Sequence, residues 1–184
     1  MRKNFGAKPF LYPQPVMIIG TYDENGEANA MNAAWGGIVG ANEIVIDLGS
    51  HKTTDNILKT KAFTVSIADT AHRISCDYVG LVSANQEPDK MAKAGFSTSK
   101  SEFVNAPVIH ELPLVLECVL KQVLGGSKFI GEIKNVGADE SILSEDGEID
   151  LGKFHPITYD AVHHGYYELG SRVGNAFKDE MQLK

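Results

Sequence analysis

The segment from residue 50 to residue 56 contains the densest group of side chains able to bind an anion. It stands where an apolar run ends and a helical pattern begins, and its members are Ser50, His51, Lys52, Thr53, Thr54 and Asn56. Backbone N–H groups at a helix N-terminus lack partners, and the helix dipole favours negative charge there. A phosphate would therefore fit this site. Plain helix capping beside a solvated lysine explains the same residues equally well.

A second stretch, from residue 29 to residue 37, combines small residues with amide side chains. Small residues let a flat ligand approach the backbone closely, and asparagine amides can bond the rim of a heteroaromatic ring. The residues that could line such a ligand are Asn29, Met31, Asn32, Ala33, Ala34 and Trp35. Taken alone, this stretch favours a simpler interpretation, a barrel strand with Trp35 packed in the core.

The third stretch contains the tyrosine pair Tyr166 and Tyr167 near the end of the chain. Tyrosines can stack on a ring or donate a hydroxyl hydrogen bond, and packing of the chain end on the core is an equal alternative. No set of histidines and carboxylates has the spacing of metal ligands, so we expect no metal site. Cys76 and Cys118 lie far apart with no Cys-x-x-Cys pattern, which predicts a reducing compartment. Cys118 stands in an apolar strand pattern and is expected to be packed, and Cys76 has no activating base nearby in the sequence, so neither is predicted to be a redox centre.

The elements that must position these residues are short strands with few helices. An Asn25-Gly26 turn links the first two predicted strands, and Gly125-Gly126-Ser127 links a long hairpin. Strands are predicted over residues 16–22, 28–34, 43–49, 63–67, 114–124 and 129–136, and helices over 54–60, 70–79 and 88–94. The helices do not alternate with the strands as in βαβ units. The pattern therefore predicts a mainly antiparallel sheet closed into a barrel, with peripheral helices.

Length and charge exclude several classes of protein. The chain has 184 residues, which favours a single domain over residues 1–184. Its formal net charge of −7 argues against a nucleic-acid partner. No apolar run is long enough to cross a bilayer, and no apolar region follows the charged N-terminus, so we expect neither a membrane span nor a secretory signal. These features together predict a cytoplasmic protein.

Taken together, these stretches resemble the flavin reductase-like, FMN-binding split-barrel family, and flavoredoxins in particular. The resemblance covers residues 13–177 and depends on the order and spacing of several short motifs. These are Pro15-Val16, residues 29–36, residues 50–57, Phe63, Leu116-Glu117-Cys118 and residues 166–170.

The resemblance implies a Greek-key split barrel that forms a homodimer, with FMN in a groove near the subunit interface. Strand residues 29–35 would line the isoalloxazine ring, and Ser50, Lys52, Thr53 and Thr54 would hold the phosphate. Ser83 and Asn85 would lie near the ribityl chain or phosphate, and Tyr167 would approach the flavin, from the partner chain in one arrangement. The full predicted set is Asn29, Met31, Asn32, Ala33, Ala34, Trp35, Ser50, His51, Lys52, Thr53, Thr54, Asn56, Ser83, Asn85 and Tyr167.

The implied function is an oxidoreductase that passes electrons from NAD(P)H, or from a protein electron donor, through FMN. The flavin carries the chemistry, so no side chain is assigned as a general acid or base. Two alternatives remain. One is a split-barrel oxidase related to pyridoxamine-phosphate oxidases, which we expect to place more arginines at the phosphate. The other is a flavin-binding carrier without turnover.

Overall fold

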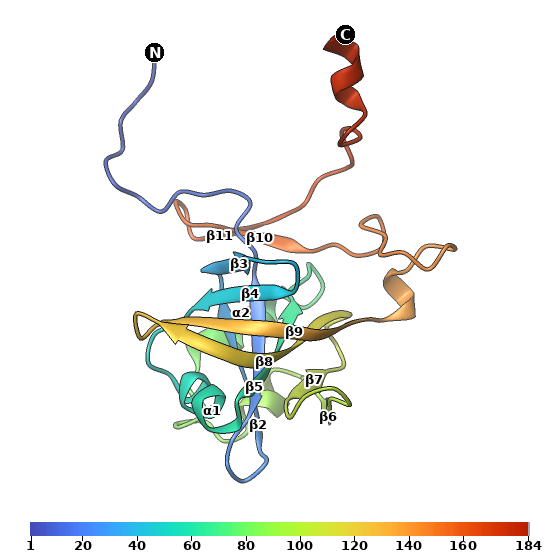
Figure 1. Ribbon diagram of the computed structural model, residues 1–184. Helices are drawn as coiled ribbons and strands as arrows, with labels where there is room; N and C mark the ends of the chain where they lie inside the picture. Colours follow the sequence, from blue (N-terminus) through green and yellow to red (C-terminus); the bar gives the residue numbers. More distant parts are fainter. Residues whose placement is uncertain (184) are drawn as a thin grey trace.

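The computed structural model describes residues 1–183, and seven of its strands form one sheet in the order β2-β1-β5-β8-β9-β4-β3 (Figure 1). Every neighbouring pair in this sheet is antiparallel. The strands are β1 (Met17–Tyr22), β2 (Ala28–Ala33), β3 (Gly36–Ile38), β4 (Glu43–Asp47), β5 (Ala62–Ile67), β8 (Leu114–Leu124) and β9 (Lys128–Ala138). The predicted mainly β, antiparallel fold is confirmed.

The sheet is curled, and its two edges meet at one short connection. Strands β2 and β3 are the edges, yet only Ala34 and Trp35 separate them in the chain. The edges do not pair with each other within residues 1–183, so the curled sheet is a barrel split between β2 and β3. The seam of the split therefore lies at Ala34 and Trp35.

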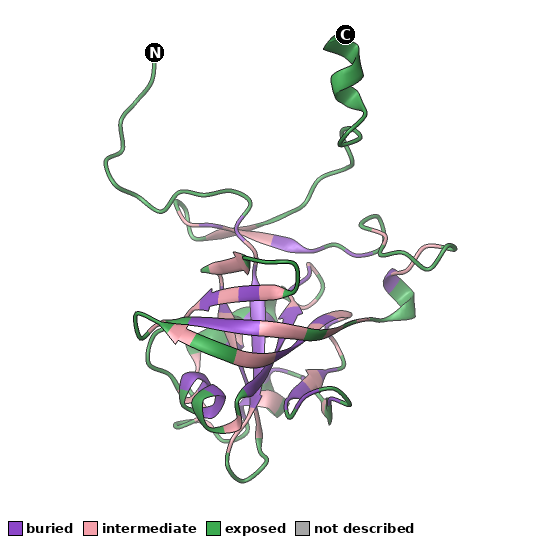
Figure 2. Ribbon diagram, in the orientation of Figure 1, coloured by how far each residue is buried: buried purple, intermediate pink, exposed green. Residues whose placement is uncertain are grey.

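Strand β1 is buried on both faces and separates two hydrophobic layers (Figure 2). Met17 and Ile19 point into the barrel, where they belong to one core with Phe63. Ile18 belongs to a second core, which includes Val79 of helix α2. Side chains alternate between the faces of a strand, so β1 supplies both layers.

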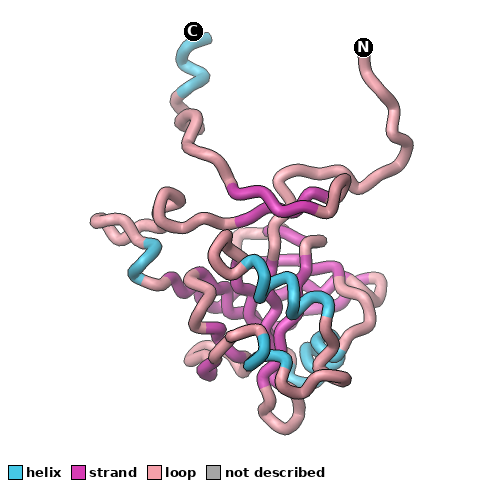
Figure 3. Tube along the Cα trace, turned by 180° about the vertical axis from the view of Figure 1, so that it is seen from behind, coloured by secondary structure: helices cyan, strands magenta, loops and turns pink. Residues whose placement is uncertain are grey.

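Two helices cover the outer face near β2 (Figure 3). These are α2 (Arg73–Leu81) and the single turn α3 (Lys90–Lys93), whereas α1 (Lys52–Thr60) also packs against β1 and β2. The predicted helix over 70–79 begins later because the Thr70 N–H donates to the His155 carbonyl oxygen at 3.0 Å. The predicted helix over 88–94 is shortened to one turn, and the predicted helix over 54–60 begins at Lys52.

Several short elements were not predicted from the sequence. They are β3, the paired strands β6 (Thr98–Lys100) and β7 (Pro107–Ile109), the hairpin strands β10 (Ile157–Asp160) and β11 (Gly165–Glu168), and the 3₁₀ helices η1 (Glu140–Ile142) and η2 (Asp179–Leu183). The β10–β11 hairpin lies above the split of the barrel, and both chain ends extend beyond it (Figure 1). Within residues 1–183, no helix has the length and apolar character needed to cross a membrane.

Candidate functional site

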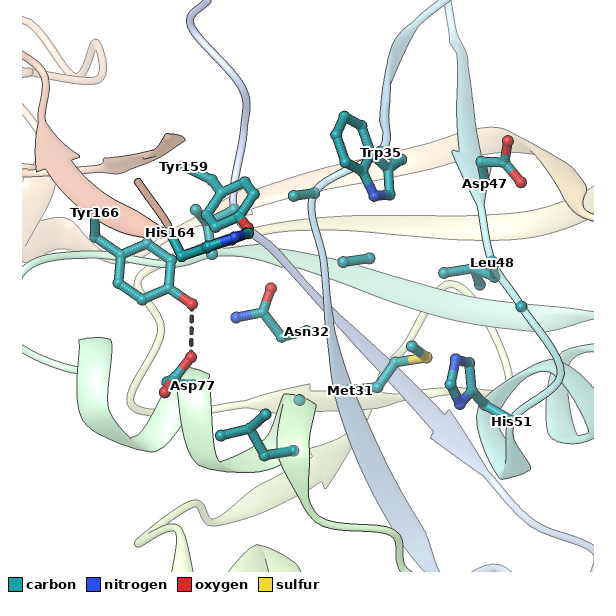
Figure 4. Close-up of a pocket in the computed structure, with 16 residues that line it drawn as sticks. Met31, Asn32, Trp35, Asp47, Leu48, His51, Asp77, Tyr159, His164 and Tyr166 are labelled. Atoms are coloured by element: carbon teal, nitrogen blue, oxygen red, sulfur yellow. Dashed lines mark hydrogen bonds between the residues drawn. The ribbon is translucent and has the colours of Figure 1, made fainter. Parts of the chain in front are cut away.

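A cavity of about 480 Å³ opens beside the seam of the barrel (Figure 4). Its walls come from β2 and the following connection, the end of β4, helix α2 and the β10–β11 hairpin. The lining residues include Met31, Asn32, Ala33, Ala34, Trp35, Asp47, Leu48, His51, Asp77, Gly80, Tyr159, His164 and Tyr166. Residues far apart in the sequence thus meet at one edge of the sheet.

Strand β2 is held against helix α2 by close packing and by a hydrogen bond. Asn32 Nδ2 donates to the Cys76 carbonyl oxygen at 3.1 Å. A Cβ added at Gly80 would lie 2.7 Å from the Asn32 Cβ, so only glycine allows this approach. Trp35 is 42% exposed, at the rim of the cavity, so the interpretation that places it in the core is wrong. The indole lies outside because its residue belongs to the seam and not to a paired strand.

Aromatic side chains of the β10–β11 hairpin form the wall shared with helix α2. The Tyr166 hydroxyl donates to Asp77 Oδ1 at 2.7 Å (Figure 4). Burial and the Asp77 carboxylate raise the pKa of Tyr166 above its ordinary value. The Tyr159 hydroxyl lies 2.7 Å from His164 Nδ1, and the Tyr159 and Tyr166 ring centroids are 6.0 Å apart. These contacts fix the hairpin over the cavity.

A smaller pocket of about 150 Å³ continues from this cavity. Met31, His51, Gly80 and Leu81 line both spaces, so the two are contiguous. The lining of the small pocket is more cationic, and its polar side chains are those of Asn29, His51, Lys52, Thr53, Ser83 and Lys90. A cavity with apolar and aromatic walls therefore leads into a pocket with two ammonium groups.

Lys90 is the functional candidate that the sequence analysis missed. The residue is only 3% exposed, and its Nζ donates to the Ala30 carbonyl oxygen at 2.7 Å. Burial lowers the pKa of Lys90 to about 8. An ammonium group offers three donors, so two remain for a ligand. In the sequence Lys90 is one of two lysines in a short helical pattern, and no local signal distinguishes it from exposed Lys93.

Asn29 supplies a buried acceptor with no partner. Its Nδ2 donates to Thr53 Oγ1 at 2.8 Å, but no group within residues 1–183 donates to its Oδ1. A buried acceptor without a hydrogen bond lowers the stability of the fold unless a ligand donates to it. A hydroxyl-bearing chain that ends in a phosphate would satisfy Asn29 Oδ1 and the free N–H groups of Lys90. The ribityl phosphate of FMN has this chemistry, so the residues present fit the group.

The N-terminus of α1 is organised by His51 and Thr54. The His51 N–H donates to Thr54 Oγ1 at 2.9 Å, and Thr54 Oγ1 donates to the His51 carbonyl oxygen at 2.7 Å. Thr54 is thereby used as a cap. Lys52 lies at the small pocket, where its Nζ is 3.3 Å from Asp23 Oδ2. The Lys52 ammonium group therefore forms an ion pair with the Asp23 carboxylate.

The structure brings together ten of the residues predicted for cofactor binding. These are Asn29, Met31, Asn32, Ala33, Ala34, Trp35, His51, Lys52, Thr53 and Ser83. Five others do not line either space within one chain: Ser50, Thr54, Asn56, Asn85 and Tyr167. Asn56 is in the core, where its Nδ2 donates to Thr21 Oγ1 at 3.1 Å. Tyr167 is 59% exposed, because neighbouring residues of β11 face opposite ways and Tyr166 takes the cavity side. The roles of all fifteen in cofactor binding stay predictions.

Both cysteines are buried and free. Burial raises the pKa of Cys76 and of Cys118 to about 12. The packing predicted for Cys118 is confirmed, and Cys76 is buried as well, so neither thiol is in a form that reacts readily.

The chain matches the flavin reductase like domain over residues 10–164. It is similar to the solved structure of the flavoredoxin of Desulfovibrio vulgaris (Miyazaki F), with 36% identity, a TM-score of 0.93, and coverage of 97% of this chain and 98% of that one. The flavoredoxin from Methanosarcina acetivorans is 27% identical, with a TM-score of 0.89 and full coverage of both chains, 100% and 100%. The uncharacterized protein YdfE of Bacillus subtilis (strain 168) is 25% identical over 97% of this chain and 94% of its own. The curled antiparallel sheet is the split-barrel flavin reductase fold, and the chain belongs to the flavin reductase-like domain family.

Proposed function

We propose that this protein binds FMN and passes electrons through it, from NAD(P)H or from a protein electron donor to an acceptor. The observation that carries this proposal is the continuity of two unlike spaces. The larger cavity has apolar and aromatic walls that suit a flat ring system, and the small pocket presents Lys52 and buried Lys90. FMN combines these two features, because a ribityl chain joins its flat ring to a phosphate.

Individual side chains have distinct parts in the proposed binding. Lys90 and Lys52 hold the phosphate, together with Thr53 and the N-terminal amides of α1. Asn29 Oδ1 accepts a hydrogen bond from a ribityl hydroxyl, and Ser83 lies at the same pocket. Because the whole chain is acidic, with a formal net charge of −7, this local cationic pocket must supply the attraction for an anion.

The bound flavin supplies the two-electron chemistry. The protein residues orient the ring and limit water around it. Trp35 and the hairpin residues Tyr159 and Tyr166 border the larger cavity, and the Tyr166–Asp77 hydrogen bond holds the hairpin to α2. The remaining opening provides access for an electron donor or acceptor. No side chain is assigned a proton-transfer step.

The test begins with the spectrum and ligand affinities of the purified protein. A flavin spectrum, and FMN affinity far above that for riboflavin, are expected because riboflavin has the same ring without the phosphate. Lys52→Ala should weaken FMN binding by roughly ten- to a hundredfold, since charged hydrogen bonds contribute about 1.5–3 kcal/mol each. Equal affinity for FMN and riboflavin would place the phosphate elsewhere. Oxidation of NADH or NADPH by the FMN-loaded protein tests the electron donor.

The two alternatives give different outcomes in the same experiments. A flavin carrier binds FMN tightly and oxidises neither nucleotide, even when external electron acceptors are added. An oxidase related to pyridoxamine-phosphate oxidases would oxidise pyridoxamine phosphate in the absence of NAD(P)H. Such an oxidase is expected to bind its phosphate with arginines. The cations of the small pocket are Lys52 and Lys90, which argues against this alternative.

The proposed assembly is a homodimer. Residues 1–12 and 169–183 are exposed throughout, and they include Phe5, Leu11, Val173 and Phe177. Apolar side chains on extended ends favour burial against a second copy of the chain. Both ends project on the side of the β10–β11 hairpin (Figure 1), so exposed Tyr167 would lie near the same interface. Sedimentation at micromolar concentration should give a dimer, and a monomer with FMN bound would contradict this assembly.

A further inference from the structure

Tyr159 and His164 form a polar contact in the wall of the larger cavity, away from the small pocket. The Tyr159 hydroxyl lies 2.7 Å from His164 Nδ1, and both side chains line the cavity. Figure 4 shows His51 and Met31, which also line the small pocket, on the opposite side of the cavity. The proposed phosphate site is the small pocket, so this contact lies at the ring end of the FMN site.

The contact with Tyr159 determines which nitrogen of His164 carries the proton. A tyrosine hydroxyl and a neutral imidazole each have one hydrogen to donate. Within residues 1–183 the Tyr159 hydroxyl has no acceptor other than His164 Nδ1, so Nδ1 accepts from it. The imidazole proton is then on Nε2, which has no partner among the same residues. His164 therefore presents to the cavity an N–H donor that the fold does not use.

The backbone at His164 is an independent reason to assign this side chain a function. Its φ of 56° is in the left-handed region, which glycine adopts most readily. The residue ends the turn between β10 and β11, and Gly165 follows it directly. A histidine at this position makes the turn less stable than a glycine would. Residues held in such conformations concentrate at ligand sites.

Asn32 of β2 supplies an acceptor in the same cavity. Its Nδ2 donates to the Cys76 carbonyl oxygen at 3.1 Å, which fixes the orientation of the amide. Its Oδ1 receives no hydrogen bond from the part of the chain that the structure describes, and the side chain lines the cavity. Figure 4 shows this oxygen on the side of the Tyr159–His164 contact. One donor and one acceptor are thus open to the same ligand.

The two carboxylates in the cavity lining, Asp47 and Asp77, are already paired. Asp77 Oδ1 accepts from the Tyr166 hydroxyl at 2.7 Å, and Asp47 Oδ2 lies 3.3 Å from Lys128 Nζ. The open polar groups of this wall are therefore one neutral donor and one neutral acceptor. A primary carboxamide matches both, because its oxygen accepts and its NH2 group donates. A quinone or another ketone has only acceptor oxygens and would satisfy the donor alone.

We infer that His164 Nε2 and Asn32 Oδ1 bind the carboxamide of the nicotinamide of NAD(P)H and thereby determine selectivity for the electron donor. The inference rests on the proposed function, and it adds the residues that recognise the donor. His164 donates to the carboxamide oxygen, and Asn32 accepts from the NH2 group. Tyr159 is a positioning residue, because its hydroxyl keeps the imidazole proton on Nε2.

The first experiment measures binding of tetrahydro-NADH, an analogue that cannot transfer a hydride, to the FMN-loaded protein through the change in flavin absorption. His164→Asn should weaken binding by about three- to tenfold, the effect of one hydrogen bond. Asparagine tolerates the left-handed conformation, so the turn is kept. His163→Asn is the matched control and should leave the affinity unchanged. The His163 side chain is 76% exposed and pairs with Asp160 outside the cavity.

Two further variants separate the imidazole from the turn that carries it. His164→Gly removes the side chain and suits the left-handed backbone, so the free energy of unfolding should hold or rise while binding weakens as in His164→Asn. Tyr159→Phe should weaken binding by only about twofold, since the imidazole proton is then shared between its two nitrogens. Denaturant unfolding measures the stability of each variant, and the absorption titration measures its affinity for tetrahydro-NADH.

Steady-state kinetics test the part of the carboxamide that Asn32 recognises. The reduced acetylpyridine analogue of NADH carries a methyl group in place of NH2, so its KM for the parent protein should be about three- to tenfold above that of NADH. His164→Asn should raise the KM for both nucleotides, because both keep the carbonyl oxygen. The KM for a quinone acceptor should not change.

The outcomes separate this inference from the proposed function. Equal affinity of the parent, His164→Asn and His163→Asn for tetrahydro-NADH overturns the inference. A raised KM for the quinone alone also overturns it and assigns the donor to the electron acceptor. FMN binding without any affinity for tetrahydro-NADH overturns the inference together with NAD(P)H as the donor. Analogue binding that depends on His164, without oxidation of NADH or NADPH, supports the carboxamide site and overturns the proposed electron transfer from NAD(P)H.

Discussion

Lys90 Nζ donates a hydrogen bond of 2.7 Å to the carbonyl oxygen of Ala30, which joins helix α3 to strand β2 below the small pocket. The lysine is buried, and β2 is an edge strand whose neighbouring residues line the proposed ring site. The Lys90 side chain therefore both holds α3 against β2 and places a positive charge in the small pocket. This relation makes Lys90 the most informative position for substitution.

Lys90→Met should keep the aliphatic packing of the lysine and remove its ammonium group. We expect FMN affinity to fall by roughly ten- to a hundredfold, because charge-assisted hydrogen bonds contribute about 1.5–3 kcal/mol each. Fluorescence titration measures the loss, and riboflavin affinity should change little. Lys93→Met is the control, since Lys93 is exposed and pairs with Glu87 outside the pocket. If both substitutions have the same effect on FMN, Lys90 does not hold the phosphate.

FMN affinity should depend on pH through Lys90. Burial lowers the pKa of Lys90 to about 8 from the ordinary value of 10.5. Above about pH 8 the ligand-free protein loses this proton, and binding a phosphate must restore it. Affinity should therefore fall by up to about tenfold per pH unit as pH rises above that value. The titration is repeated between about pH 7 and about pH 10, with riboflavin as the ligand that lacks the phosphate.

The lowered pKa of Lys90 also predicts how the stability of the ligand-free protein depends on pH. Between about pH 8 and 10.5 the unfolded chain binds a proton at Lys90 that the folded chain has lost. Because the unfolded state binds more protons there, the Lys90 contribution to the free energy of unfolding rises with pH across this window. Denaturant titrations of the parent and Lys90→Met isolate the contribution, and parallel pH profiles for the two proteins would refute it.

Gly80→Ala should disturb the contact between α2 and β2. The new Cβ would lie 2.7 Å from the Asn32 Cβ, so strand or helix must move. We expect a loss of about 1–3 kcal/mol in the free energy of unfolding, the usual cost of overpacking, together with weaker FMN binding. Gly37→Ala is the control, because no heavy atom lies within 4 Å of a Cβ at that position. Denaturant unfolding measures both, and equal stability of the two variants would argue against the close approach.

The cysteines should take no part in electron transfer. Burial raises the pKa of both thiols to about 12, so neither forms a thiolate at neutral pH. A disulfide reagent that labels thiols should leave the native protein unmodified and label both cysteines after denaturation. A folded Cys76→Ser and Cys118→Ser double variant should retain FMN binding and any NAD(P)H oxidation. Loss of electron transfer with FMN still bound would show that a thiol is required.

The sequence alone determined the class of fold, because alternating apolar residues and turn signals are local. The Asn25-Gly26 turn and the long hairpin around Gly125 are features of this kind, and the structure contains both. The motif at residues 29–35 and the one at residues 50–54 also predicted the region of the site. Ten of the fifteen predicted residues line its two contiguous spaces.

Only the tertiary structure decided which residues of each motif face those spaces. Tyr166 and Tyr167 are equivalent in the sequence, and the pairing of β11 with β10 directs one toward the cavity and the other to the surface. Thr54 resembles Thr53, but the helix begins so that Thr54 bonds to His51 while Thr53 reaches the pocket. Lys90 is buried because α3 packs on β2, a contact between residues 60 positions apart. Such contacts depend on packing across the chain, which local spacing does not encode.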